Sequence, residues 1–301
     1  MTQSSVLITG ASGFIGSHLI PYLLHKQYRI IALTRQKNRS AIDPNLHWIN
    51  DLDQLPDSDI DYVINLAGES IGQGRWHPVR KQQLIESRVN TTRQLYQYLT
   101  QHHIQPKRII SGSAVGFYGI DPLEQWQQIL TEQSPPQAIF MSELCQQWEA
   151  VTAQYPAQKT KIIRLGIVFG KNGGILPQML LPIKFNLVSK IGSGRQPCVW
   201  IHIDDVIAAI EYLMHTDTNT DVFNLVAPEL SSQQSFAQTA AQILHRKPLF
   251  SLPAWLMKRL LGEQSQLILN GQYVQPQALQ QHGFEFKYPT LTSALTHLLK
   301  K

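Results

Sequence analysis

Three glycines near the amino terminus form the first pattern that could do chemistry. The turn Gly10-Ala11-Ser12-Gly13-Phe14-Ile15-Gly16 follows the apolar run Val6–Thr9 and leads into an amphipathic stretch. A strand, a glycine turn and a helix in this order present backbone amides and a positive helix end to an anion. The spacing departs from the common dinucleotide fingerprint, and a loop that binds nothing is the alternative. The placement at a first strand-to-helix turn favours a dinucleotide pyrophosphate. The expected contacts are Gly10, Ser12, Gly13, Phe14, Ile15 and Gly16.

A second signal stands at the end of the next β-branched run, Arg29–Thr34. In dinucleotide-binding folds an acidic residue here bonds the ribose 2′-hydroxyl of NAD. This chain has Arg35 instead, followed by Lys37 and Arg39. A solvated basic loop is the alternative. The sequence therefore predicts NADP(H) rather than NAD(H), with Arg35 at the 2′-phosphate.

Alternating short strands and helices must position these residues. The predicted strands are Val6–Thr9, Arg29–Thr34, Leu46–Ile49, Tyr62–Leu66, Arg108–Ser111, Lys161–Leu165 and Val222–Leu225. The predicted helices are Phe14–Lys26, Pro78–His102, Ala138–Gln154 and Asp204–Met214. This order predicts an α/β fold, a doubly wound parallel sheet of the Rossmann type. Residues 1–170 and 201–227 are assigned to it, and 171–200 and 228–301 to a smaller, mostly helical substrate lobe.

Composition excludes several classes of protein. The 301 residues, 43% of them hydrophobic, allow a large core, and no apolar run approaches a bilayer span. No leader pattern stands at the start, so a cytoplasmic protein without a membrane partner is expected. Cys145 and Cys198 lack metal-ligand spacing, and no metal is expected. The net charge of +5 comes from scattered residues, which suits an anionic small molecule better than nucleic acid. No oligomeric state is predicted.

Five further segments carry a family resemblance. They are Asn65-Leu66-Ala67-Gly68-Glu69, Arg75-Trp76, Ser87-Arg88, Ser111-Gly112-Ser113-Ala114 and Trp200–Val206. With the glycine turn, they make the chain resemble the extended short-chain dehydrogenase/reductases, more narrowly their nucleoside-diphosphate-sugar epimerase-like branch. The tail is similar to that branch's C-terminal domain of unknown function, at Gly262-Glu263, Val274, Pro276, Gly283-Phe284 and Pro289. The resemblance implies that Leu66, Ala67, Gly68 and Glu69 pass beside the adenine ribose and that Ser113 is the catalytic Ser/Thr.

The usual catalytic relay is incomplete. In a typical member, Ser/Thr polarises the reacting oxygen, a Tyr transfers the proton, and a Lys four residues later lowers the Tyr pKa. When Glu149 is aligned with the family's acidic residue, Met141 and Cys145 take the Tyr and Lys places, and neither supplies that chemistry. Tyr118 is a candidate substitute acid, with a core aromatic as the alternative. Asn90 matches an Asn that supports the relay in many members, with a helix-surface Asn as the alternative.

Two residues near the predicted lobe are candidates for substrate contact. Arg195, in a glycine turn, could grip an anionic group, with a solvated surface Arg as the alternative. His202 lies in Trp200–Val206, the segment that, by the same resemblance, returns the chain to the core domain. Two functions stay open. One is an NADP-dependent oxidoreductase or epimerase-like enzyme that acts on a small molecule through Ser113. The other is a non-catalytic NADP(H)-binding or redox-sensing protein, which the missing Tyr and Lys favour.

Overall fold

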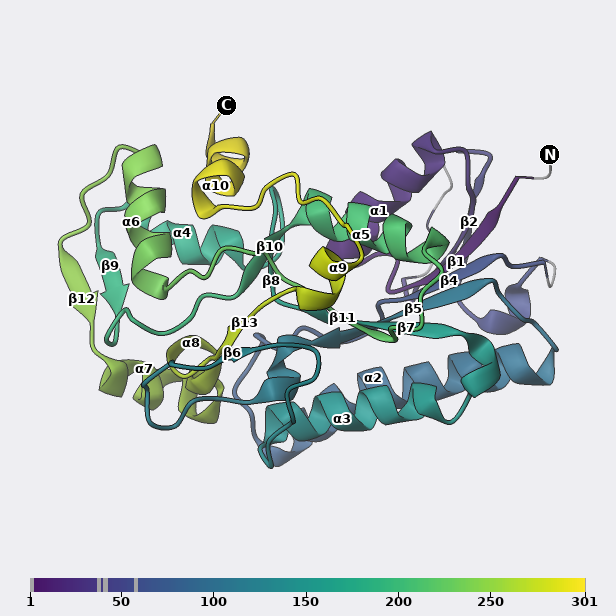
Figure 1. Cartoon of the computed structure of the whole chain (residues 1–301), viewed down its shortest axis with the longest axis horizontal. Coiled ribbons are helices and arrows are strands. Elements are labelled where there is room, and N and C mark those ends of the chain that lie inside the picture. The colour runs from purple at the N-terminus through teal and green to yellow at the C-terminus, as the bar shows by residue number, and fades with distance from the viewer. Residues whose placement is uncertain (1–2, 37–38, 40–42, 57–58, 301) are drawn as a thin grey trace.

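A seven-stranded parallel sheet forms the centre of the computed structural model, which describes residues 3–36, 39, 43–56 and 59–300 (Figure 1). The strands are β1 (Ser5–Thr9), β2 (Arg29–Leu33), β3 (Leu46–Ile49), β4 (Tyr62–Asn65), β5 (Arg108–Ala114), β7 (Thr160–Leu165) and β11 (Val222–Leu225). Their order is β11-β7-β5-β4-β1-β2-β3. The order reverses at β1, so the glycine turn follows the strand at the topological switch point, where ligands bind in such sheets. The predicted fold class is confirmed.

Helices cover both faces of the sheet. α1 (Phe14–His25) and α5 (Ile203–His215) lie on one side, and α2 (Pro78–Gln101) and α3 (Phe140–Ala153) lie on the other (Figure 1). The alternation along β1 shows why this segment is a strand. Val6 and Ile8 pack in the cluster that contains α1, whereas Leu7 between them packs against α2. Burial on both faces is typical of a parallel sheet covered by helices.

The third predicted helix begins two residues later than the predicted start at Ala138. Ile139 has an extended backbone with φ −134° and ψ 156° and caps α3 without a side-chain hydrogen bond. The Ser142 hydroxyl accepts a hydrogen bond of 2.9 Å from the backbone N–H of Gln137. This contact holds the preceding loop outside the helix.

A smaller group of elements packs beside the sheet, at the left of Figure 1. It contains α4 (Leu176–Lys184), β9 (Val188–Ile191), α6 (Gln233–Ile243), β12 (Phe250–Leu252), α7 (Ala254–Leu261), α8 (Gln266–Leu269) and α10 (Leu291–Leu299). Leu180, Trp200, Phe236 and Leu295 share its hydrophobic cluster. Short 3-10 turns form at Leu52–Gln54, Val115–Tyr118, Pro156–Gln158 and Gly262–Ser265.

Several short elements connect the sheet with this group. β8 (Ile167–Phe169) pairs with β10 (Trp200–His202), and β6 (Ile129–Leu130) pairs with β13 (Tyr273–Val274). Ala278 and Leu279 of α9 (Gln277–Gln281) pack in the main cluster of the sheet. A part of the predicted lobe therefore contacts the dinucleotide domain, and the exact domain division stays a prediction. Within the described ranges no helix is long and apolar enough to cross a membrane.

Candidate functional site

A buried polar network ties together the strand ends at the switch point. The Thr9 hydroxyl donates to Asn65 Oδ1 at 2.7 Å, and Asn65 Nδ2 donates to Thr92 Oγ1 at 2.9 Å and to Ser111 Oγ at 3.1 Å. Because buried hydrogen-bonded networks fix geometry, the loops that follow β1, β4 and β5 leave the sheet from set positions. The sequence motifs did not identify Thr92, which lies on α2.

The glycine turn is built for close approach of backbone to backbone. Gly10 has φ +67°, and a Cβ at Gly10 would lie 2.6 Å from the carbonyl oxygen of Leu66. A Cβ at Gly16 would lie 2.5 Å from the carbonyl oxygen of Ala11. The turn, the loop after β4 and α1 are therefore too close for side chains at these two positions. Any other residue at Gly10 would push the turn away from the loop after β4.

The amino end of α1 fits a diphosphate. No side chain caps the helix, and the Gly13 N–H is used inside the turn, where it donates to the Gly10 carbonyl at 2.9 Å. The amides of the first helical turn therefore lack a side-chain acceptor and can bind an anion. The Phe14 ring lies against the segment from Gly170 to Gly174, and Ile15 packs on the main cluster. Both side chains anchor the turn, so the expected residues gather here.

Hydrogen bonds of the residues on either side of Arg35 hold its backbone beside the glycine turn. Ser12 Oγ and Thr34 Oγ1 share a hydrogen bond of 2.9 Å. Asn50 Nδ2 donates to the carbonyl oxygens of Thr34 and Gln36 at 2.8 and 2.9 Å. No sequence motif indicated this role of Asn50, which follows β3. The backbone at Arg35 is thereby positioned while its side chain stays 85% exposed.

Glu69 lies between two arginines at the edge of the same site. Arg35 Nη1 lies 3.5 Å from Glu69 Oε1, and Arg80 Nη1 donates to Glu69 Oε2. Hydrogen bonding to Arg80 holds the pKa of Glu69 below its usual range. Arg39 stacks on Trp48 at 4.6 Å instead, and Lys37 lies outside the described residues. A phosphate at Arg35 would therefore meet one available guanidinium and one anionic neighbour.

Ser113 belongs to a buried charged network at the end of β5. Its hydroxyl donates to Glu149 Oε1 at 2.6 Å. Arg164 donates to both oxygens of Glu149, through Nε at 2.9 Å and Nη2 at 2.7 Å. Burial acts to lower the pKa of Arg164, but the hydrogen bonds and charge of Glu149, together with Tyr118, outweigh burial and raise this pKa. A hydroxyl paired with a carboxylate can accept a proton from an alcohol while passing on its own.

On α3, Cys145 lies beside Ser113 and Met141 lies beside Gly116. A Cβ at Gly116 would lie 2.8 Å from Met141 Cε and 3.8 Å from Cys145 Sγ. The Cys145 thiol is within hydrogen-bonding reach of Ser113, and burial raises its pKa to about 12. Met141 has no acidic proton, and a thiol with so high a pKa is a poor acid at neutral pH.

The candidate acid Tyr118 is enclosed. Its ring is 1% exposed, its hydroxyl donates to Asn224 Oδ1 at 2.7 Å, and Arg164 donates to it at 2.9 Å. Burial raises the pKa of Tyr118. The structure places Tyr118 as an enclosed aromatic whose hydroxyl is hydrogen-bonded inside the network, and its role as the acid stays a prediction.

Two other candidates lie apart from Ser113. Asn90 is on the exposed side of α2, where its Oδ1 accepts a hydrogen bond of 3.1 Å from Arg93. Arg195 is exposed after β9, with its guanidinium 5.9 Å from the centre of the Trp126 ring. Among the described residues no hydrogen bond or ion pair joins either of them to Ser113. Asn90 is thus placed as a helix-surface residue.

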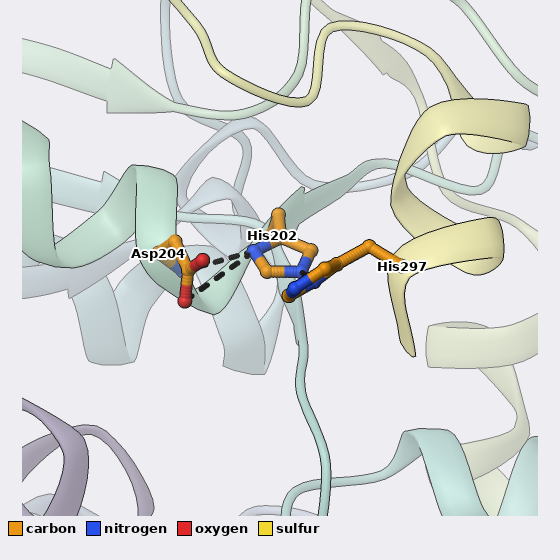
Figure 2. A group of neighbouring side chains, drawn as sticks. All are labelled: His202, Asp204 and His297. Atoms are coloured by element: carbon orange, nitrogen blue, oxygen red, sulfur yellow. Dashed lines mark hydrogen bonds and ion pairs between the residues drawn. The ribbon is translucent and has the colours of Figure 1, made fainter. Parts of the chain in front are cut away.

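His202 is a structural link in the interior rather than an exposed substrate contact. Figure 2 shows its ring between Asp204 and His297. Nδ1 accepts from the backbone N–H of Asp204 at 3.0 Å and so caps α5, while Nε2 and His297 Nδ1 lie 3.1 Å apart. The ring is fully buried, and burial lowers its pKa to about 4. The His202 ring has no exposed surface, so a substrate has no access to it in this structure.

The same three residues are close enough to suggest a metal site. His202, Asp204 and His297 each offer a ligand atom, all within 4.8 Å of one another. However, Asp204 approaches the Nδ1 edge of His202 and His297 the Nε2 edge (Figure 2), and Lys287 Nζ lies 3.5 Å from Asp204. The amino end of α5 adds positive partial charge. These features oppose a cation, and we assign no metal here.

Family models match most of the chain. The model for the NAD dependent epimerase/dehydratase family matches residues 6–225, and that for a domain of unknown function, DUF1731, matches residues 252–298. An epimerase family protein of Staphylococcus saprophyticus is 36% identical over 300 residues, which cover 97% of this chain and 98% of the relative. An epimerase family protein of Staphylococcus aureus is 34% identical over 98% of this chain and 99% of its own length.

Solved structures show the same arrangement. The human epimerase family protein SDR39U1, solved with NADPH, is 29% identical with a TM-score of 0.88, and the match covers 98% of both chains. The UDP-glucuronic acid 4-epimerase of Bacillus cereus, solved with UDP-glucuronic acid and NAD, has a TM-score of 0.76 over 98% of this chain and 97% of its own. At 19% identity that second match shows a shared fold alone.

Proposed function

The chain belongs to the NAD dependent epimerase/dehydratase family, and we propose from that premise that it binds NADP(H) and acts as an atypical oxidoreductase or sugar-nucleotide epimerase-like enzyme. The observation that carries the proposal is the shared position of three features. The glycine turn after β1, Arg35 after β2 and Ser113 at the end of β5 all lie at the carboxyl ends of parallel strands. That edge at the switch point is where such sheets hold dinucleotides.

Different residues around the glycine turn suit different parts of the cofactor. The open amides of the first turn of α1 suit the diphosphate, and the loop from Leu66 to Glu69 suits the adenine ribose. Arg35 suits the 2′-phosphate because it is exposed, positioned by Asn50, and replaces the acidic residue that favours NAD. The human relative solved with NADPH supports the same preference. When bound, the nicotinamide supplies a carbon that accepts or donates hydride.

Ser113 and Glu149 supply the proton path in this proposal. During oxidation of a carbinol, its hydroxyl proton passes to Ser113 Oγ, and the Ser113 proton passes to Glu149 Oε1 over 2.6 Å. The hydride from the same carbon would go to the oxidised nicotinamide, so the substrate would lose two hydrogens and become a carbonyl. Arg164 donates hydrogen bonds to both oxygens of Glu149 and so holds the carboxylate beside Ser113. Reduction runs through the same atoms in reverse.

A second candidate function is a non-catalytic NADP(H)-binding or redox-sensing protein. It is favoured by Met141 and Cys145, which take the places of the family's Tyr and Lys and cannot supply their chemistry. The enclosed hydroxyl of Tyr118 favours it too. The predicted small-molecule substrate and cytoplasmic location stay predictions.

Turnover separates the two candidates. Purified protein with NADPH or NADP⁺ is offered carbonyl, alcohol and sugar-nucleotide compounds while the absorbance of the reduced nicotinamide is followed. We expect turnover that Ser113→Ala removes, because the hydroxyl that relays the proton is lost. Ser251→Ala, an exposed residue of β12, serves as the control and should keep full activity. Full turnover in Ser113→Ala would contradict the proton path, and no turnover with tight NADPH binding would favour the second candidate.

A further inference from the structure

Arg88 on α2 is a half-buried cation with spare hydrogen-bond donors. Its Nη2 donates to the carbonyl oxygen of Glu69 at 2.8 Å, and its Nη1 donates to the carbonyl of Leu84 at 3.2 Å and to Ser87 Oγ at 3.3 Å. A guanidinium has five N–H donors. In the described part of the chain, the Arg88 Nε and one Nη2 hydrogen therefore have no acceptor. Burial lowers the pKa of Arg88.

No carboxylate in the described ranges forms an ion pair with Arg88, in contrast to three other buried or half-buried arginines. Arg80 pairs with Glu69, Arg108 with Asp217 and Arg164 with Glu149. A buried charge is costly unless it is paired. An enclosed guanidinium that lacks an internal anion and keeps free donors is suited to an anion that comes from outside the chain.

Arg88 also lies between the two halves of the candidate site. Its Cζ would be 3.1 Å from a Cβ at Gly68, in the loop expected beside the cofactor. On the other side its guanidinium lies 5.4 Å from the centre of the Trp148 ring on α3. Its charge acts on the thiol of Cys145, which is within reach of Ser113. The guanidinium thus stands between the loop after β4 and the end of β5.

We propose that Arg88 binds the nicotinamide half of the cofactor, at its phosphate and ribose, and supplies from α2 the positive charge that α3 lacks at Cys145. This inference rests on the proposed NADP(H) binding. A nicotinamide that reaches Ser113 must bring its own phosphate and ribose past the loop at Gly68, where Arg88 is the enclosed cation. Charge-assisted hydrogen bonds from its free donors then orient the ring toward Ser113.

Two ligands distinguish this role from a purely structural one. NADPH contains both halves of the cofactor, whereas 2′,5′-ADP contains only the adenosine half with its 2′-phosphate. Both are titrated by calorimetry into the wild-type protein, Arg88→Met, Arg88→Lys and Arg93→Met. Arg93→Met removes a charge from the same helix at a position that contacts Asn90, so it is the matched control. Binding of 2′,5′-ADP also reports that each variant is folded.

We expect Arg88→Met to weaken NADPH binding at least tenfold and to leave 2′,5′-ADP binding within twofold. Arg88→Lys should recover part of the loss, and Arg93→Met should match the wild-type protein. Unchanged NADPH binding in Arg88→Met would overturn the inference. An equal loss of both ligands would also overturn it, because Arg88 would then act only by bracing the Glu69 loop. A wild-type protein that binds neither ligand would instead refute the proposed function itself.

Discussion

Replacing His202 with Asn should remove a large part of the acid sensitivity of the folded protein. The His202 ring is fully buried, and burial lowers its pKa from 6.5 to about 4. Between these values the unfolded chain binds a proton that the folded chain does not. The stability that depends on a neutral His202 ring is therefore fully present above about pH 6.5 and is lost as the pH falls toward 4. A pKa shift of this size corresponds to about 3 kcal/mol in the free energy of unfolding.

Asn is the matched replacement because it is also a favoured helix cap and can accept the Asp204 N–H without titrating. Urea unfolding of both proteins at a series of pH values from 4 to 7 gives the difference in their free energies of unfolding. Carboxylates common to both proteins cancel in that difference. We expect the difference, wild type minus variant, to rise by about 3 kcal/mol from pH 4 to pH 7. Parallel profiles would show that His202 is not held neutral in the fold.

Two further substitutions test the glycine turn and the charged network. Gly13→Val should leave the fold intact, because a Cβ there meets only the Gly10 carbonyl at 3.0 Å. It should abolish NADPH binding, because the branched side chain fills the diphosphate position. Normal NADPH binding in calorimetry would refute this interpretation of the turn. Arg164→Met should cost about 3 to 5 kcal/mol in urea unfolding because it leaves Glu149 buried without its partner. The double variant with Glu149→Leu should recover much of that loss, and a cost below about 1 kcal/mol for Arg164→Met alone would count against a buried ion pair.

The fold was predictable because its signals are local. Each strand of the central sheet has a short apolar run, and the helices between them carry spacings of three and four. The pairings of β8 with β10 and of β6 with β13 were not predictable. They join segments of two or three residues far apart in the chain, such as Leu130 and Val274. Runs that short carry no periodicity.

The candidate site, like the fold, was predictable only in part. The glycine turn and Ser113 belong to contiguous motifs, so the sequence identified them. The pairing of Glu149 with Arg164 depends on tertiary packing, and its only local signal was a charged residue inside the apolar run Lys161–Leu165. Closeness in sequence does not fix where the Tyr118 hydroxyl points. A 3-10 turn over Val115–Tyr118 directs this hydroxyl to Asn224, inside the buried network.

The most direct test of the central claim is a titration of wild type and Arg35→Ala with NADPH and NADH. We predict that the wild-type protein prefers NADPH and that Arg35→Ala weakens NADPH binding by on the order of 1.5 to 3 kcal/mol, or about ten- to a hundredfold. The lower end is expected because the Arg35 side chain is 85% exposed. NADH binding should not change, since it carries no 2′-phosphate. Equal affinities of the wild-type protein for the two cofactors would contradict the account.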